Sequence, residues 1–425
     1  MGTTATVVRK LFVLLLGEGA ARILGVATFA LLARALGLAD LGVFSFGMSL
    51  ALVLECVMDF GQNAQLGRVV AQDPKAGLFQ FTHAASNKTL IAIALSAVVA
   101  AVMYFGRFST QETLTVLLLL VWAAGLSVLD SLRSAARSLE RFRLDSTVNG
   151  AESFLRLSAV LLVWALGGKL VHFGIAFAIE SWIAVFVAWA YLGKKHDALL
   201  KPPANAGDLR RFLRQSAPFG IAVMSLSAFY NLDQVFVRTI VGAASNGLYG
   251  AAARVSFTAS VVGSLLAMVA YPDLARMRDD LAAFRRYLGR AVALAGAVGL
   301  SAATLVFIWA GPLLTLLFGA KFAAADSLLR VLAIVIVFRG ISTVALYAAN
   351  ALGRSRQIAI VAIVFTVCNV TANVVLLPRY GAAAAAWISA VGEIALASAL
   401  LAVSFNRSRT TAPDARVEVV PSARG

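Results

Sequence analysis

The chain has 425 residues, of which 60% are hydrophobic and only 14% are charged, and its mean hydropathy is +0.85. Soluble domains are about half apolar and about a quarter charged, so this composition excludes an ordinary soluble enzyme, a disordered scaffold and a disulfide-bonded miniprotein. The net charge of +16 would suggest nucleic acid in a soluble protein. In a membrane protein it is typical of cytoplasmic loops, which collect lysine and arginine, so no nucleic-acid partner is expected.

Apolar runs of about 20 residues, the length that crosses a bilayer as a helix, recur along the chain. The first run carries Glu18 and Arg22 and leads directly into the second, which indicates a span and not a cleaved signal peptide. The sequence therefore predicts an all-α membrane protein with twelve transmembrane helices. The predicted spans are 11–33, 40–61, 87–106, 113–132, 147–167, 171–193, 217–238, 247–271, 287–310, 325–347, 357–377 and 382–404.

Basic residues are distributed unevenly over the predicted loops. If the N-terminus lies in the cytoplasm, most of the 37 lysines and arginines fall in cytoplasmic segments and few fall in external loops. Positively charged loops stay on the cytoplasmic side of a membrane, so both termini are predicted to be cytoplasmic.

The two halves of the chain resemble each other. Residues 37–44 (GLADLGVF) match 242–249 (GAASNGLY) at an offset of 205, and residues 135–143 (AARSLERFR) match 348–356 (AANALGRSR) at an offset of 213. The growth in offset indicates an insertion in the second half, which we place in the external loop 311–324. Because six crossings return the chain to its starting side, the repeats are parallel, and such repeats typically bound a central cavity.

This duplication defines the predicted domains. An N-terminal six-helix lobe covers residues 1–193, and a C-terminal six-helix lobe covers residues 217–404. A basic cytoplasmic linker at 194–216 joins them. The polar residues 405–425 are predicted to form a disordered cytoplasmic tail.

Ionisable residues inside the spans are informative because each costs roughly 2.5–3.5 kcal/mol on insertion scales. Glu18 and Arg22 lie four residues apart, as do Glu152 and Arg156, so each pair shares a helix face and is predicted to form a structural ion pair. Asp59 is predicted to join such a pair, because it lies at about the depth of Arg22.

Two segments resemble a known family. Residues 32–71 resemble the N-terminal signature of bacterial oligosaccharide flippases, with Leu36-Gly37, Leu41-Gly42 and Asp59-Phe60-Gly61 in the matching positions. Residues 231–256 look like the seventh and eighth spans of the same family. These flippases are the O-antigen and exopolysaccharide repeat-unit translocases of the multidrug/oligosaccharidyl-lipid/polysaccharide exporter superfamily.

The resemblance implies a fold, a function and a location. The fold would be MATE-like, with two six-helix lobes around a central cavity. The protein would move a polyprenyl-diphosphate-linked oligosaccharide from the cytoplasmic to the periplasmic leaflet of the bacterial inner membrane, by ion-coupled alternating access. The expected partners are this lipid-linked oligosaccharide, membrane lipids, a proton or sodium ion, and polysaccharide polymerase or glycosyltransferase proteins.

A diphosphate needs cations that stay charged in a membrane cavity, and arginine provides them. The predicted substrate-binding residues are therefore the intramembrane arginines Arg22, Arg156, Arg254 and Arg339. The alternative is that each arginine forms an ion pair that fixes helices together. Arg290 lies near a span end and is predicted to reach the membrane interface.

Three carboxylates are candidates for ion coupling. Glu180 and Glu393 lie 213 residues apart, and each falls near the middle of its lobe's last span. A desolvated carboxyl group favours its protonated form, which suits a residue that binds and releases a proton. The alternative is a neutral glutamate hydrogen-bonded within the bundle. Asp233 is the third candidate, from its position in the family resemblance.

The sequence contains no cysteine–histidine cluster with metal spacing and no nucleotide-binding or hydrolase motif, so no cofactor, metal or enzymatic activity is expected. Two other functions remain open. One is a multidrug or metabolite cation antiporter of the same fold, against which the intramembrane arginines count. The other is a non-transporting scaffold or an enzyme of glycan assembly, and the short external loops count against the enzyme.

Overall fold

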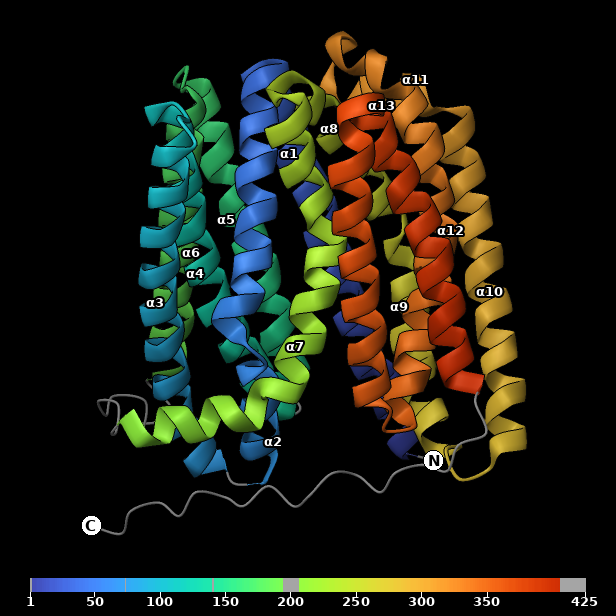
Figure 1. The fold of residues 1–425 in the computed structure, drawn as a ribbon. Coiled ribbons are helices and arrows are strands. Elements are labelled where there is room, and N and C mark those ends of the chain that lie inside the picture. The colour runs from blue at the N-terminus through green and yellow to red at the C-terminus, as the bar shows by residue number, and fades with distance from the viewer. Residues whose placement is uncertain (1, 73, 140, 194–205, 406–425) are drawn as a thin grey trace. The chain divides into compact units, whose positions relative to one another are not determined.

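A computed structural model gives the fold of the chain (Figure 1). It describes the backbone of residues 2–72, 74–139, 141–193 and 206–405. Side chains are described from Gly17 to Phe405, except at positions 18, 68, 71–80, 82–83, 140, 142 and 191–219. The predicted tail, apart from Phe405, and residues 194–205 of the predicted linker lie outside the described residues.

The described residues contain helices and no strand, and they fall into two compact units. The first unit comprises Met1–Thr28 and Leu50–Met224, and the second comprises Phe29–Ser49 and Ser225–Asp414 as far as they are described. Two helices belong to both units: α1 (Gly2–Asp59) and α7 (Ala206–Phe236). The predicted domains differ from these units, because residues 29–49 pack with the second half of the chain.

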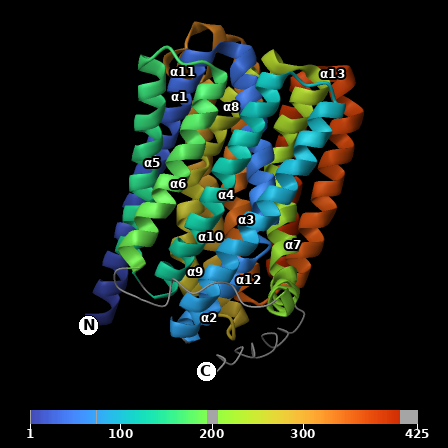
Figure 2. The same cartoon turned by 90° about the vertical axis from the view of Figure 1, so that its left-hand side faces the viewer.

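The first unit is a bundle of packed helices. Helix α4 packs against α3, α5 and α6, and the short α2 packs against α3 and α4 (Figure 2). Leu66, Phe81, Val128 and Leu132 are among the buried side chains at its core. The helices are α2 (Gln62–Gln72), α3 (Pro74–Phe105), α4 (Thr110–Ser138), α5 (Phe142–Ala165) and α6 (Leu170–Gly193).

The second unit is built around α12, which packs against α8, α9, α10 and α13. Phe284, Leu288 and Val344 are among the side chains buried between α9, α10 and α12. The elements are the π-helix η2 (Val237–Val241), α8 (Ala243–Ala259), α9 (Val261–Arg276), α10 (Leu281–Ile308), α11 (Ala310–Phe318), the 3₁₀-helix η3 (Ala320–Ala325), α12 (Asp326–Ala351) and α13 (Ser355–Phe405).

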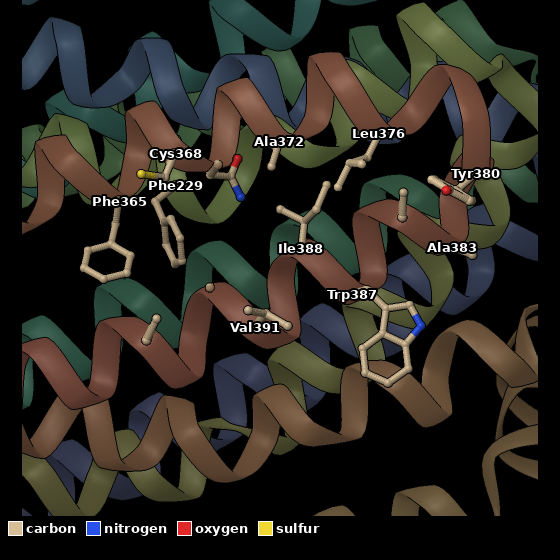
Figure 3. A pocket seen from close by; sticks show the side chains of 14 residues that line it. Phe229, Phe365, Cys368, Ala372, Leu376, Tyr380, Ala383, Trp387, Ile388 and Val391 are labelled. Carbon is tan, nitrogen blue, oxygen red and sulfur yellow. The ribbon is translucent and has the colours of Figure 1, made fainter.

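Ten helices in the described part of the chain are long and apolar enough to cross a membrane, so the chain is a multi-pass membrane protein. Two of them have at least about twice the 20 residues of one crossing: Gly19–Asp59 within α1, with 41 residues, and α13, with 51 residues. Each contains one glycine with positive φ, Gly37 at 76° and Gly381 at 61°. At Gly381 the chain turns back, and the two arms of α13 lie side by side (Figure 3). The number of twelve crossings stays a prediction.

The matching segments of the two halves have matching backbone geometry. Gly37 and Gly242 both have positive φ, 76° and 124°, with extended ψ, and each separates two helical segments. A Cβ atom on Gly42 would lie 1.8 Å from the Ala243 carbonyl oxygen, and one on Gly247 would lie 2.1 Å from the Leu38 carbonyl oxygen. This reciprocal contact supports the duplication and explains why residues 29–49 pack within the second unit.

The predicted insertion at 311–324 coincides with α11 and η3. Arg34 donates hydrogen bonds to the carbonyl oxygens of Leu316 (2.5 Å) and Leu317 (3.2 Å) at the end of α11. The rings of Phe29 and Phe318 meet edge to face, with their centres 5.8 Å apart. The inserted helix therefore adds contacts that hold residues 29–49 in the second unit.

Candidate functional site

The first buried charged cluster, in the first unit, is centred on Arg156 of α5. Its Nε donates to Glu180 Oε1 of α6 at 2.9 Å, and its Nη2 pairs with Glu152 one turn earlier on α5. The guanidinium carbon lies 5.4 Å from the centre of the Trp122 ring and 5.7 Å from that of Phe177. The Glu152 and Glu180 side chains are only 5% and 1% exposed. The predicted Glu152–Arg156 pair is thus present, with Glu180 as a second partner.

The second cluster lies in the second unit and contains the glutamate related to Glu180 by the repeat. Arg339 Nε of α12 donates to Glu393 Oε2 at 2.9 Å, and Ser342 Oγ donates to Glu393 Oε1 at 2.5 Å. The Arg339 guanidinium stacks 3.7 Å from the centre of the Tyr230 ring. Both repeat-related glutamates are thus paired with an arginine, but the arginines come from non-equivalent helices. Sequence spacing could not reveal the pair of residues 339 and 393.

The third cluster surrounds Asp233 of α7, which is 4% exposed. Asn369 and Asn373 donate their Nδ2 atoms to Asp233 Oδ1 at 3.1 and 2.9 Å. Tyr249 Oη donates to Oδ2 at 3.1 Å, and Ser389 Oγ also donates to Oδ2. Within the described residues, no lysine or arginine forms an ion pair with Asp233, so neutral donors alone satisfy this carboxylate. Carboxylate, amide and hydroxyl oxygens are the ligands that hard cations such as sodium prefer.

The remaining predicted arginines are partly buried, Arg22 in the first unit and Arg254 in the second. The Arg254 guanidinium lies 5.5 Å from the centre of the Phe29 ring. The Glu18 side chain lies outside the described residues, so the Glu18–Arg22 pair stays a prediction.

Asp59 does form a buried ion pair, and its described partner is Lys88 of α3. The two atoms Asp59 Oδ1 and Lys88 Nζ are 2.8 Å apart, and the Lys88 side chain is 0% exposed. Nζ also bonds to Asn63 Oδ1 (2.9 Å), the Ser127 carbonyl oxygen (2.8 Å) and Ser131 Oγ (2.8 Å). Sequence reasoning assigned Lys88 to the cytoplasmic end of a span and missed this role. One signal was available in the sequence, since a long apolar run begins directly after Lys88 and Thr89.

An apolar groove of about 720 Å³ lies in the second unit between the two arms of α13, with Phe229 of α7 at its side (Figure 3). Leu376 and Tyr380 line it from the first arm, and Trp387 and Val391 from the second. Asn369 lies in its wall and also donates to Asp233, so the groove borders the third cluster. Sequence reasoning did not predict this groove.

The profile of the polysaccharide biosynthesis protein family matches residues 7–278. The chain belongs to this family. The flippase resemblance read from residues 32–71 and 231–256 is thus confirmed at the level of the polysaccharide biosynthesis family. Among curated protein sequences, none matches the chain.

Several solved structures share the fold of this polysaccharide biosynthesis protein. The lipid II flippase MurJ, in an inward closed conformation, has a TM-score of 0.75 and 15% identity, over 92% of this chain and 87% of MurJ. An inward-facing multidrug resistance MATE transporter has a TM-score of 0.68 and 15% identity, over 91% of this chain and 93% of the transporter. A MOP superfamily transporter from Pyrococcus furiosus has a TM-score of 0.66 and 15% identity, over 93% of both chains.

At these identities the likeness shows the fold. It confirms the predicted all-α, MATE-like membrane architecture for this member of the polysaccharide biosynthesis family. The solved proteins are a lipid II flippase, a multidrug resistance transporter and a MOP superfamily transporter.

Proposed function

We propose that the protein is a flippase that moves a polyprenyl-diphosphate-linked oligosaccharide from the cytoplasmic to the periplasmic leaflet of the bacterial inner membrane. The observation that carries this proposal is membership of the polysaccharide biosynthesis family across residues 7–278, combined with a fold like that of MurJ. The two compact units would supply alternating access. Glycosyltransferases would supply the lipid-linked glycan, or polysaccharide polymerases would consume it.

The arginines support an anionic substrate. Arg156 and Arg339 each form an ion pair with a buried carboxylate. The oxygens of a diphosphate have a similar geometry and could bind the same planar guanidinium groups. Because arginine stays charged when it is desolvated, these groups can bind phosphate inside a membrane. We propose that Arg22, Arg156, Arg254 and Arg339 contact the diphosphate during transport.

Deleting the gene is expected to cause the lipid-linked oligosaccharide to accumulate on the cytoplasmic leaflet. Charged hydrogen bonds contribute about 1.5–3 kcal/mol, so alanine at Arg22, Arg156, Arg254 or Arg339 should reduce export about tenfold or more. Export is measured as surface glycan at matched protein level. Arg290→Ala is the matched control, because Arg290 is exposed on α10.

Full export by all four variants would refute the diphosphate contacts. A deletion strain with normal glycan but altered drug resistance would instead indicate the multidrug antiporter.

We also propose that the transport is ion-coupled through Asp233, Glu180 and Glu393. Asp233 has the environment of a cation or proton site, since its four donors are neutral and its carboxylate is buried. Glu180 and Glu393 are each held by one arginine, so either could exchange that partner for a proton.

Asp233→Asn is expected to remove the effect of the coupling ion on the melting temperature of the purified protein. The carboxamide keeps the shape of the side chain but loses its charge, so bound sodium or a bound proton loses its main ligand. The melting temperature is measured in sodium and in choline chloride, and across a pH series. Asp326→Asn, which alters an ion pair with Arg330 at the start of α12, serves as the control. A wild-type melting temperature that responds to neither sodium nor pH, or a response that survives in Asp233→Asn, would exclude Asp233 as the coupling site.

A further inference from the structure

We propose that the groove between the arms of α13 binds the isoprenoid tail of the lipid-linked oligosaccharide, with Arg379 at its end contacting the diphosphate. This inference rests on the proposed flippase function for the identity of the lipid. It adds a second binding site, because Arg379 belongs to none of the three charged clusters and the groove shares only Asn369 with the third.

The shape of the groove fits a linear chain. Its lining residues recur every four positions on the first arm, from Cys368 to Tyr380, and again on the second arm, from Ala383 to Ala395 (Figure 3). Twelve residues of helix rise about 18 Å, so the groove runs along the membrane-spanning direction for more than half of the hydrocarbon thickness. Small residues such as Ala372 and Gly392 keep it open between larger side chains.

The chemistry of the walls favours hydrocarbon over a peptide or a sugar. Alanine, leucine, valine, isoleucine and aromatic side chains dominate the lining. The amide of Asn369 is already engaged by Asp233. A peptide backbone or a sugar would leave its polar groups without partners here, which costs several kcal/mol per group in an apolar setting. An isoprenoid chain carries no such groups.

The end of the groove near Gly381 has the composition of a membrane interface. Tyr380 and Trp387 are 66% and 54% exposed there, and such aromatic residues concentrate at the level of lipid head groups. Arg379 precedes Tyr380 and is exposed. The helix breaks at this point because Pro378 and Gly381 interrupt α13, so Arg379 lies at the turn beside Tyr380, the last groove residue of the first arm.

Charge complementarity therefore selects a lipid whose hydrocarbon tail carries an anionic head. The distribution of basic residues predicts that the Arg379 loop is external. The groove would then receive the flipped lipid on the periplasmic side, after its diphosphate leaves the buried arginines.

Photocrosslinking tests lipid binding at this site without a measurement of transport. The full-length protein is placed in phosphatidylcholine nanodiscs with undecaprenyl diphosphate that carries a diazirine in its chain, and adducts are mapped by peptide mass spectrometry. Adducts are expected on the residues that line the groove. Ala372→Phe fills the groove and should remove most of them. Val374→Phe is the matched control, because Val374 is 51% exposed on the same arm and does not line the groove.

Two further probes separate the tail from the head. Arg379→Gln should reduce the adducts of undecaprenyl diphosphate but leave those of neutral undecaprenol unchanged. Unlabelled phosphatidylglycerol should not compete at equal mole fraction. Adducts spread evenly over the lipid-facing helices, or equal competition by phosphatidylglycerol, would overturn the proposal and show that ordinary lipids cover the groove. Groove-specific adducts in a protein whose deletion leaves glycan export normal would instead count against the flippase function alone.

Discussion

Lys88→Met is expected to lower the free energy of unfolding by about 3–5 kcal/mol, the usual effect of removing one partner of a buried ion pair. Methionine fills a similar volume but leaves Asp59 without its cation, 2.8 Å away in the native protein. Asn63, Ser127 and Ser131 would lose a hydrogen-bond donor at the same time. The Lys88 ammonium joins α1, α2, α3 and α4 through these contacts, so its loss should loosen the whole end of the first unit.

Thermal unfolding in detergent micelles measures this effect. The double variant Lys88→Met, Asp59→Asn should recover much of the loss, because no buried charge is left unpaired. Asparagine can also keep the cap on α2, where Asp59 now accepts from the backbone N–H groups of Gly61 and Asn63. Lys169→Met, at an exposed position before α6, should change the stability by less than about 0.5 kcal/mol. If Lys88→Met matched Lys169→Met, the buried network would contribute nothing to stability.

Gly42→Ala and Gly247→Ala should each destabilise the second unit by about 1–3 kcal/mol or more, the range for overpacked sites. The new methyl groups would lie 1.8 Å and 2.1 Å from backbone carbonyl oxygens, which cannot rotate away as a side chain can. The helices would have to separate, and the hydrogen bond from Asn246 Nδ2 to the Gly42 carbonyl oxygen, 2.7 Å long, would weaken.

Gly289→Ala is the control for these two substitutions. Gly289 lies in α10, and a Cβ atom there would meet nothing within 4 Å. Alanine should therefore be neutral or raise the stability by about 0.5–1 kcal/mol, since it restricts the unfolded chain. Melting temperatures of the three variants in the same detergent provide the comparison. Equal melting temperatures for Gly42→Ala and Gly289→Ala would contradict the close helix contact.

The sequence predicted the repeated glycine motif but not the packing of residues 29–49 with the second unit. The Gly37 and Gly242 match was visible in the sequence, and both glycines have positive φ at a break between helices. The repeat by itself divides the chain into halves and does not show where residues 29–49 pack. Gly42 and Gly247, in the same two matching segments, pack residues 29–49 against the start of α8, so these residues join the second unit. Paired small residues in both halves were the signal for that contact.

The candidate charged residues show the limit of spacing arguments. The Glu152–Arg156 pair could be predicted, because four residues bring two side chains to one helix face. The pairs of Arg156 with Glu180, Arg339 with Glu393 and Asp59 with Lys88 join different helices. No local spacing in the sequence predicts these pairs, because the partners lie far apart in the chain.

The sequence by itself determined the membrane location, the helical fold class, the family and several of the buried charges, such as Glu152, Glu180 and Asp233. These follow from composition, run length and short motifs, which are properties of contiguous residues. The tertiary structure alone decided which charge partners which, that Lys88 is buried, and that the arms of α13 enclose an apolar groove. These depend on which helix faces meet, and helix packing is set by side-chain shape across segments far apart in the chain.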